Sequence, residues 1–534
     1  MSARPALVWL TLATLGACVL YVAVVQLGAT AYDDSYFFKR IAANALRTGA
    51  FAWNVQDGPV HVSTSQAYQG LTTLVTAFTT RYFVATMRLL NAVLLMTAGW
   101  LLLRPSKAAR PLLLGAFATP LVLTTVLSGM ETALALATLA VVVTAWLKTR
   151  RVEGVAGAVA TVVMYLVRPD AALVVALLVL GRAAEQRRWP VRYAVALVLG
   201  MAAVWGACWL YYGTPLPLSF YMKSLGLHDY GASTSGPSLR AKRSHALVFA
   251  WFAAPLLFEI LRAKPWTRRD DLSVLSLAAL AFVGYHLAGT HEIMGYRARF
   301  YLPAIVPLLA AAGLAVDRTE PAKAGALGFG VAWGAFGVLA YQQRWMPTSA
   351  GFFTATVPAA AYSAAGVAAA AGLLRMRWSP AVASVAVVAG VLAWTPPHVP
   401  VVREDAAVMV RHVRETTSMR GVFAVRRCLP PDSTVYHSEM GVPGLVLFSM
   451  RLVDLVGIVS PQLGIDGQRF DDLCEAERPE AIFLPHKGYR ELAATVRDSA
   501  CLQDYVRVVK ASSSPLHVRR DLHPAFAACA GPLP

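Results

Sequence analysis

The sequence predicts a polytopic α-helical membrane protein with about 11 to 13 transmembrane helices and a small C-terminal extracytoplasmic α/β domain. Three observations predict this fold class. Hydrophobic residues make up 57% of the 534 residues and charged residues 15%, whereas soluble domains carry roughly 25% charged residues. Apolar runs long enough to cross a bilayer recur up to residue 395. After Pro396 the chain changes to short β-like runs separated by polar stretches, which favours an α/β domain.

The apolar runs are the candidate membrane spans, because each is long enough, or nearly so, to cross a hydrocarbon core of about 30 Å. The first run continues to Thr30, which is too long for a cleaved signal peptide and favours a retained helix. Residues 66–80 are flanked by polar side chains and predict a re-entrant or surface helix instead. The candidate spans are 6–30, 82–103, 111–127, 130–147, 153–167, 171–181, 191–211, 245–262, 272–289, 302–316, 322–341, 357–374 and 379–395.

The distribution of Lys and Arg predicts the orientation of these spans. Many of the basic residues lie in short loops between apolar runs, and basic short loops mark the cytoplasmic side. With a cytoplasmic N-terminus, every basic loop falls inside, so we expect a multi-pass membrane protein. The Ala-, Arg- and Val-rich composition is in the style of a GC-rich bacterial genome and indicates nothing further. The segments expected outside are 32–65, 128–129, 168–170, 212–244, 290–301, 342–356 and the C-terminal tail.

The net charge of +18 is also a feature of nucleic-acid-binding proteins. Here the basic residues are divided among short loops, and no stretch combines basic and aromatic residues as a nucleic-acid-binding module does. We therefore expect a lipid bilayer as a partner of this chain and no nucleic acid.

The chain divides into two predicted domains. Residues 1–395 form the transmembrane domain, in which the outer loop 32–65 carries an acidic motif, and residues 396–534 form the extracytoplasmic α/β domain. The PPHVP stretch between them is a stiff breaker. In the second domain we expect a helix from Glu404 to Thr416 and strands in STVYHS, RLVDLV and EAIFLP.

Four of the six cysteines lie in the C-terminal domain: Cys428, Cys474, Cys501 and Cys529. Four cysteines in one small polar domain predict two disulfides and an oxidising, extracytoplasmic compartment. The sequence leaves all three pairings open, and the alternative is that these residues are free, buried thiols.

An acidic pair, Asp33 and Asp34 in AYDDSYFFKR, directly follows the first span. Apolar residues recur behind it at helical spacing, which predicts an amphipathic helix in the membrane interface. A helix cap worth about 1 kcal/mol is the alternative, but one aspartate is enough for a cap. One carboxylate can accept a proton from an incoming hydroxyl, and the other can orient that group or hold a metal. Asp34 is the candidate metal ligand.

Three further groups lie in outer segments. Glu131 in SGMET begins an apolar span, where a helix N-terminus favours a carboxylate; a structural role and a site role are both open. Arg168 and Asp170 in LVRPDA flank a proline between two short spans. They form either a tight turn closed by an ion pair or a contact to phosphate or sugar.

The last group combines YYGTPLPLSFYMKS with THEIMGYRARFYLP. Its candidates for lining a lipid-phosphate cavity are Tyr221, Lys223, His291, Glu292 and Arg299, because Lys and Arg match phosphate oxygens. Anchoring at the interface is the alternative. The sequence has no Walker loop, GxSxG elbow or HExxH motif, and its scattered histidines favour hydrogen-bonding roles over a zinc set.

Taken in order, these stretches resemble the GT-C superfamily of membrane glycosyltransferases. The likeness is greatest to bacterial enzymes that use polyprenyl-phosphate sugars, including terminal arabinofuranosyltransferases. It rests on DDSYFFKRIAANALRTGAFAWN, SGMET, VRPDA, YYGTPLPLSFYMK, RARFYLPAIVPLL and YHSEMGVPGLVLFSMRLVDLVGIVSP. STSQAY lacks the family's Pro-Leu-Trp, LPLSFY lacks its Pro-Asn-Thr, and Asp170 stands where the family has Glu, so the sugar stays open.

The resemblance implies a GT-C-like fold, a place in the bacterial plasma (inner) membrane, and an inverting transfer of a sugar from a polyprenyl-phosphate donor. Arabinofuranose is one candidate for the sugar, and the acceptor would be an extracytoplasmic cell-envelope glycan or glycoprotein. Asp33 or Asp34 would be the general base, and Arg168, Lys223 and Arg299 would stabilise the departing phosphate. A divalent cation (Mg, Mn or Ca) on the acidic pair is compatible with the superfamily but not required by it.

Two other classes have the same general features. A lipid or solute transporter or flippase would also have many spans and buried charges, but it would be expected to show two matching halves with broken helices, and the halves here do not match. A non-catalytic assembly factor with a sensing domain is the second alternative.

Overall fold

The structure is a computed structural model, in which the chain forms two compact units. The helical unit contains residues 1–29, 87–201 and 239–406, and the sheet unit contains residues 30–86, 202–238 and 407–534. The residues described are 33–79, 83–103, 122, 129–149, 154–222, 246, 249–250, 253, 256–267, 270–289, 296–318, 417–485, 489–509, 514–531 and 533.

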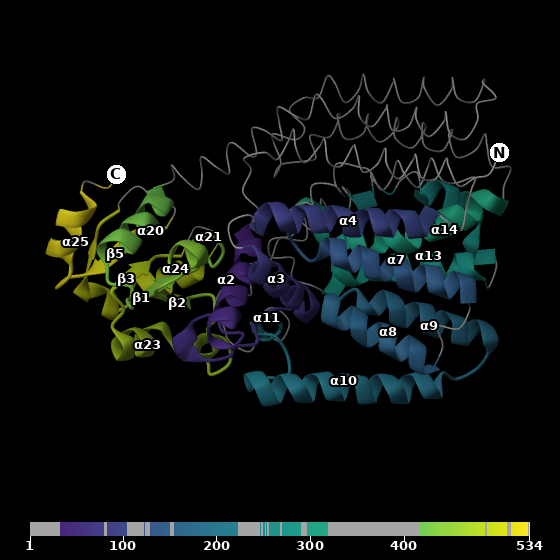
Figure 1. The fold of residues 1–534 in the computed structure, drawn as a ribbon, viewed down its shortest axis with the longest axis horizontal. Coiled ribbons are helices and arrows are strands. Elements are labelled where there is room, and N and C mark those ends of the chain that lie inside the picture. Colours follow the sequence, from purple (N-terminus) through teal and green to yellow (C-terminus); the bar gives the residue numbers. More distant parts are fainter. Residues whose placement is uncertain are drawn as a thin grey trace, which may run out of the picture. The chain divides into compact units, whose positions relative to one another are not determined.

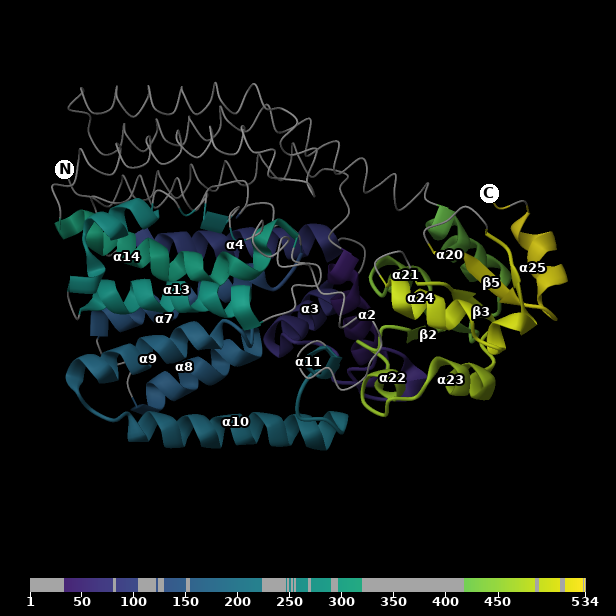
Figure 2. The same ribbon diagram turned by 180° about the vertical axis from the view of Figure 1, so that it is seen from behind.

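Long apolar helices lie side by side in the helical unit (Figures 1 and 2). They are α4 (Phe83–Leu103), α7 (Thr132–Thr149), α8 (Gly154–Val167), α9 (Ala172–Gln186), α10 (Val191–Tyr212), α13 (Asp271–Gly289) and α14 (Ile305–Arg318), the last preceded by the 3-10 helix η4 (Tyr296–Ala304). Of α4 the part from residue 87 belongs to this unit, and of α10 the part up to residue 201. Seven predicted spans are thus confirmed as helices. Five others, 6–30, 111–127, 322–341, 357–374 and 379–395, lie outside or almost wholly outside the described residues, and 245–262 is described only in part.

Several of these helices have the length and apolarity of membrane spans. Within the described residues, those long and apolar enough to cross a membrane are Val191–Tyr212, Asp271–Ala288 and Arg299–Arg318. On α10, Val198 and Leu199 are 67% and 65% exposed. Exposed apolar surface on this scale is unfavourable in water, so it fits a face that contacts lipid.

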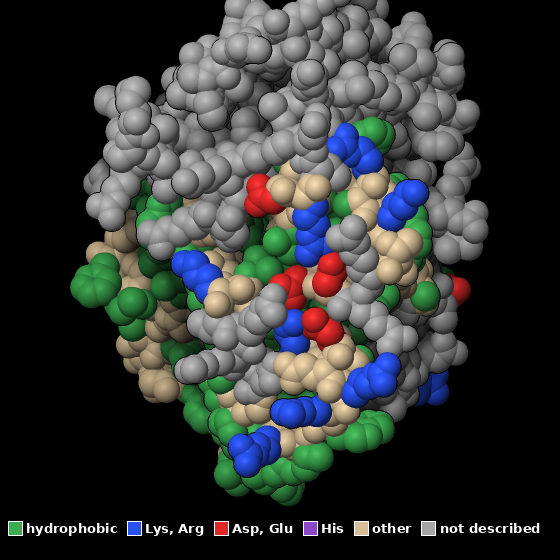
Figure 3. All heavy atoms as spheres, turned by 90° about the vertical axis from the view of Figure 1, so that its right-hand side faces the viewer, with side chains coloured by type: hydrophobic (Ala, Val, Ile, Leu, Met, Phe, Trp, Pro, Cys, Tyr) green, Lys and Arg blue, Asp and Glu red, His purple; other side chains and the backbone are tan. Residues whose placement is uncertain are grey.

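Charged residues join the helix ends at one end of the helical unit, which we call the basic end. The Arg182 side chain of α9 pairs with Glu185 and, at 2.7 Å, with Asp271 at the start of α13. Arg318 at the end of α14 pairs with Asp270 at 2.6 Å. Figure 3 shows acidic side chains near the centre of this face with Lys and Arg around them. The expected gathering of basic loops at one end is therefore found for these helices, and its cytoplasmic side stays a prediction.

The sheet unit contains a five-stranded sheet in the order β2-β1-β3-β5-β4. Strands β1 (Thr434–His437), β2 (Arg451–Asp454) and β3 (Ala481–Phe483) are parallel and match the three predicted runs. β5 (Leu516–Arg519) is antiparallel to β3 and to β4 (Tyr505–Arg507). The predicted α/β domain is confirmed, whereas its extracytoplasmic side stays a prediction. The two antiparallel strands were not predicted.

Helices cover both faces of this sheet because its strands alternate apolar side chains. Val435 packs with α20 (Thr417–Cys428), α21 (Val442–Val446) and α25 (His523–Ala530), and Tyr436 packs with α23 (Phe470–Glu477) and α24 (Arg490–Arg497). Successive side chains of a strand point to opposite faces. The short helices α22 (Pro461–Gly464) and η6 (Cys501–Asp504) also belong to this C-terminal part of the sheet unit. The expected helix 404–416 lies outside the described residues.

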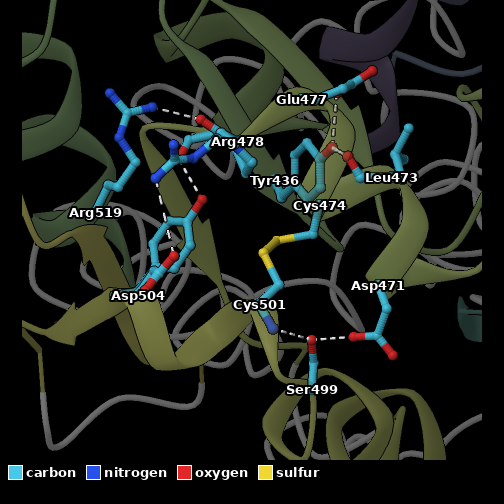
Figure 4. Close-up of a disulfide and its surroundings, with 12 residues drawn as sticks. Tyr436, Asp471, Leu473, Cys474, Glu477, Arg478, Ser499, Cys501, Asp504 and Arg519 are labelled. Atoms are coloured by element: carbon cyan, nitrogen blue, oxygen red, sulfur yellow. Dashed lines mark hydrogen bonds and ion pairs between the residues drawn. A yellow bond between two sulfur atoms is a disulfide. The ribbon is translucent and has the colours of Figure 1, made fainter.

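Both predicted disulfides are present and the structure decides their pairing. Cys428 of α20 is bonded to Cys529 of α25 on one face of the sheet. Cys474 of α23 is bonded to Cys501 of η6, and Tyr436 lies beside this second bond and donates a hydrogen bond to Glu477 at 2.7 Å (Figure 4). The alternative of free thiols is therefore wrong for these four residues.

Candidate functional site

The acidic pair begins helix α2 (Asp33–Thr48), which is the helix predicted behind the first span. The side chains of Asp33 and Asp34 lie outside what the structure describes. The rest of the helix is largely buried from Ser35 to Asn44 and packs on α3 (Gln66–Phe78) and α21. The predicted helix at 66–80 is thus confirmed as α3. Because α2 is held on two sides, the position of its first turn depends on its contacts with the C-terminal sheet domain.

Arg40 makes the main polar contact between α2 and that domain. Its Nε donates to the Trp53 carbonyl at 2.9 Å, Nη1 to the carbonyls of Gly444 (2.6 Å) and Leu447 (3.0 Å), and Nη2 to Asn54 Oδ1 and the Met450 carbonyl, both at 2.9 Å. All five N–H groups are therefore used. Burial and the neighbouring Arg47 together lower the pKa of Arg40 to about 9, against a smaller opposing effect of Asp57. The guanidinium is still charged at neutral pH, and carbonyl dipoles stabilise it.

The loop after α2 is joined to strand β2 by a second set of hydrogen bonds. The Trp53 indole donates to the Leu452 carbonyl at 2.9 Å, and Asn54 exchanges two hydrogen bonds of 3.0 Å with the Leu452 backbone. Arg451 of β2 pairs with Asp57 at 2.7 Å. No pattern in the sequence singles out Arg40, Trp53 or Asn54. Their partners lie about 400 residues away in the chain: Arg40 and Gly444, for example, are separated by 404 residues.

The segment 58–65 contacts the turn that follows α10. The Leu218 amide donates to the His61 carbonyl at 2.8 Å, and the His61 ring stacks on Tyr212 with centroids 4.7 Å apart. Gln66 Nε2, a donor, lies 2.7 Å from His61 Nε2, so His61 Nδ1 carries the proton and donates to the Thr214 carbonyl at 3.2 Å. Burial lowers the pKa of His61 to about 4. The hydrogen-bonding role expected for this histidine is confirmed.

These contacts bring two of the predicted clusters together in the sheet unit. Tyr221 directly follows the short helix α11 (Leu218–Phe220), which starts at the residue bonded to His61. Its ring lies 6.4 Å from that of Phe220. Lys223, which shares the YYGTPLPLSFYMK stretch, lies outside the described residues.

The other clusters meet in the helical unit, at the helix ends opposite the basic end. Arg168, between α8 and α9, is 4% exposed. Its Nε donates to Asp170 Oδ1 at 2.9 Å, and Asp170 Oδ2 lies 3.0 Å from His286 Nε2 of α13. Burial raises the pKa of Asp170, but the Arg168 charge and the His286 hydrogen bond together lower it well below its usual range. The turn closed by an ion pair, one of the two alternatives for LVRPDA, is therefore present.

Glu131 completes this cluster from the start of α7. Its Oε1 lies 3.9 Å from Arg168 Nη1, which is too far for a hydrogen bond. Within the described part of the chain, Arg168 Nη1 and Glu131 Oε2 are buried and have no hydrogen-bond partner. An unsatisfied buried polar atom costs about 1–3 kcal/mol, so two of them on the partners of one ion pair mark this place as unusual.

Aromatic rings form the wall beside these charges. Phe300 of η4 lies 5.7 Å from the Arg168 guanidinium and 5.1 Å from that of Arg299. The His286 ring stacks on Phe300 with centroids 5.8 Å apart. Arg299 is 9% exposed and belongs to the same group. The structure thus brings together Glu131, Arg168 and Arg299, which the sequence analysis named from three separate segments.

The remaining predictions concern His291, Glu292 and a metal ion at Asp34. His291 and Glu292 lie outside the described residues. In the described part of the chain, no three His, Cys, Asp or Glu side chains converge as metal ligands, and the Asp34 side chain is not described. The residues at hand therefore do not make up a metal site, and we derive no step through a metal.

No protein-family model matches this sequence, and no curated protein matches it. The fold is shared with ArnT from Cupriavidus metallidurans. The crystal structure of that protein bound to undecaprenyl phosphate matches with a TM-score of 0.54 and 15% identity, covering 97% of this chain and 98% of that chain. Its apo state matches with a TM-score of 0.50 and 15% identity, covering 98% and 99%. Nearly the whole chain thus shares its fold with a solved protein, whereas membership of the GT-C superfamily and the arabinofuranosyltransferase subtype both stay predictions.

Proposed function

We propose that this chain is a membrane glycosyltransferase that transfers a sugar from a polyprenyl-phosphate donor to an extracytoplasmic cell-envelope glycan or glycoprotein. One observation carries the proposal: nearly the whole chain shares the fold of a protein crystallised with undecaprenyl phosphate. The buried charged cluster of Glu131, Arg168 and Asp170 adds support, because apolar helices can pack together without such a cluster. Arabinofuranose is our first candidate for the sugar.

The proposed reaction is a single displacement at the anomeric carbon. The acceptor oxygen forms a bond to that carbon while the bond from the carbon to the phosphate oxygen breaks, so the configuration is inverted. The acceptor proton passes to Asp33 or Asp34, and polyprenyl phosphate leaves with the bonding electron pair. A general base must come within about 3 Å of the oxygen that it deprotonates. The first turn of α2 is suited to this because the contacts of Arg40 fix the helix behind it.

The departing phosphate gains negative charge, and positive charge placed where that charge develops stabilises the transition state. We assign this role to Lys223 and Arg299, with Tyr221, His291 and Glu292 as neighbouring contacts. Glu131 and Arg168 are assigned to the sugar. A bilayer-embedded pocket would keep the prenyl chain out of water, and the proposal requires no nucleotide-binding fold. The extracytoplasmic side of the reaction follows from the basic short loops, which the positive-inside rule places in the cytoplasm.

The test uses the full chain, purified and supplied with synthetic polyprenyl-phosphate arabinofuranose, mannose, glucose and galactose together with cell-envelope glycan fragments. Release of polyprenyl phosphate and glycosylation of the acceptor are both measured. One donor should be consumed, and Asp33→Asn or Asp34→Asn should lower turnover about 10²–10⁴-fold. Asp432→Asn, which alters an exposed carboxylate of the sheet domain, is the matched control and should leave turnover unchanged.

Two results would contradict the proposal. If both aspartate variants turned over donor at the wild-type rate, the pair would be a helix cap and the general base would lie elsewhere. If reconstituted protein moved a labelled polyprenyl-phosphate lipid across the bilayer without consuming any donor, the chain would be a flippase.

A further inference from the structure

The Glu131–Arg168 pair has a charge balance that does not suit an anion. Arg168 carries one positive charge, and two carboxylates already face it: Asp170 at 2.9 Å and Glu131 at 3.9 Å. These two carboxylates more than offset the charge of Arg168 itself in a buried setting, where charge interactions are strong, so of the two arginines beside Phe300 it is Arg168 that is less suited to a phosphate. Of the two ligands that the sequence left open for Arg168, phosphate is thus disfavoured.

The hydrogen-bonding balance points to a different ligand. Arg168 Nε and Nη2 are both used by Asp170, whereas Nη1 is a donor with no acceptor among the described residues. Glu131 Oε2 is an acceptor with no donor there. A single group that accepts from Nη1 and donates to the Glu131 carboxylate would satisfy both atoms. A hydroxyl does this, because its oxygen accepts one hydrogen bond while its O–H donates another.

Other contacts hold this pair in place. His286 and the Ala171 amide, which lies 3.0 Å from Asp170 Oδ1, fix the carboxylate that orients Arg168. Asn91 Nδ2 donates to the Met130 carbonyl at 3.2 Å and so holds the backbone next to Glu131. A donor and an acceptor fixed in this way discriminate strongly, because a ligand without the matching group leaves both of them unpaired in a buried site.

We propose that Glu131 Oε2 and Arg168 Nη1 form a subsite that binds one hydroxyl group of a carbohydrate substrate, with Asp170 and His286 as positioning residues. This inference rests on the proposed function and assigns the selectivity of the same site. The hydroxyl belongs either to the donor sugar or to the acceptor glycan, since both carry the same chemistry.

The experiment uses wild-type protein and the donor that it consumes, with deoxy analogues of that donor in one arm and deoxy analogues of the acceptor in the other. Removal of one particular hydroxyl should lower kcat/KM about 10- to 100-fold, because it leaves two buried polar atoms unpaired. The arm in which this loss occurs identifies the source of the hydroxyl. No variant is needed for this measurement, so it does not depend on the folding of a mutant.

A second measurement tests the residues directly. In Glu131→Gln the fall in kcat/KM between the natural substrate and its deoxy analogue should shrink to about threefold or less. The reason is that this variant has already lost the carboxylate with which the hydroxyl pairs. In Glu185→Gln, which changes a carboxylate at the basic end, the penalty should keep its wild-type size.

The outcomes separate the inference from the proposed function. If transfer occurs but no deoxy analogue loses more than about threefold, or if Glu131→Gln slows all substrates equally, the pair holds a structural water and the inference is overturned while the function stands. If none of the donors is consumed, the proposed function fails and this inference fails with it.

Discussion

Replacing Arg40 by Lys should destabilise the sheet unit and disturb the acidic pair two turns earlier on α2. Arg40 is 1% exposed and donates five hydrogen bonds, four of them to backbone carbonyls. Lysine has three N–H donors on a single nitrogen and cannot reproduce a planar fork. At least two of the five acceptors therefore lose their partner, which at about 1–1.5 kcal/mol each predicts a loss of about 2–3 kcal/mol.

The assay is thermal unfolding of the full chain in detergent, followed by intrinsic fluorescence. For a unit of this size each kcal/mol shifts Tm by about 2–4 °C, so Arg40→Lys should lower Tm by about 4–12 °C. Arg426→Lys is the matched control, because Arg426 is exposed on α20 and its replacement should shift Tm by less than about 2 °C. Turnover of Arg40→Lys, measured well below its Tm, should also fall.

The result that would refute this reasoning is an Arg40→Lys protein that melts with the wild-type protein. The carbonyls around Arg40 would then be satisfied by water or by small backbone movements, and the guanidinium would not be what fixes α2. A variant that loses stability but keeps full turnover would refute only the link between α2 and the acidic pair.

Two further predictions follow from the sheet unit. A Cβ at Gly444 would lie 2.5 Å from Trp53, whose buried ring is fixed by its hydrogen bond to Leu452. Gly444→Ala should therefore destabilise the protein by about 1–3 kcal/mol, measured by thermal unfolding. Gly70→Ala on α3 is the control and should not destabilise, because a Cβ there meets no atom within 4 Å. Equal melting of the two variants would contradict the packing described for Trp53. Burial, helped by Arg507, lowers the pKa of His517 from 6.5 to about 4. The unfolded chain therefore binds a proton at this histidine more readily than the folded protein does. The contribution of neutral His517 to the free energy of unfolding is complete above pH 6.5 and is lost as the pH falls towards 4. The loss amounts to at most about 3 kcal/mol. Tm measured between pH 7 and pH 4.5 should fall less in His517→Asn than in wild type, and parallel curves would contradict this.

The sequence by itself determined the helices, because the free energy of placing a long apolar run in a bilayer or a core depends on that run alone. Helices α4, α7, α8, α10 and α13 begin and end within a few residues of the predicted limits. The three parallel strands were also predictable, because each is a short run of β-branched and apolar residues. Strands β4 and β5 were missed, because YVR and LHVR are too short and too polar to show the alternation of a half-buried strand.

The candidate site was predictable only as a set of residues. Polar side chains in outer segments are few, so Glu131, Arg168 and Arg299 could be named from the sequence alone. Which of them meet depends on contacts between residues far apart in the chain, such as the 116 residues that separate Asp170 from His286. No local pattern encodes such a contact, because it is set by how the helices pack.

Tertiary structure alone also decided what each charge does. By sequence, Arg168 was a candidate contact to phosphate or sugar, while no pattern singled out Arg40. The fold surrounds Arg40 with carbonyls that use every donor, and it leaves one nitrogen of Arg168 facing a carboxylate. The physical reason is that a buried charge takes its role from the groups that replace its water, and those groups come from elsewhere in the chain.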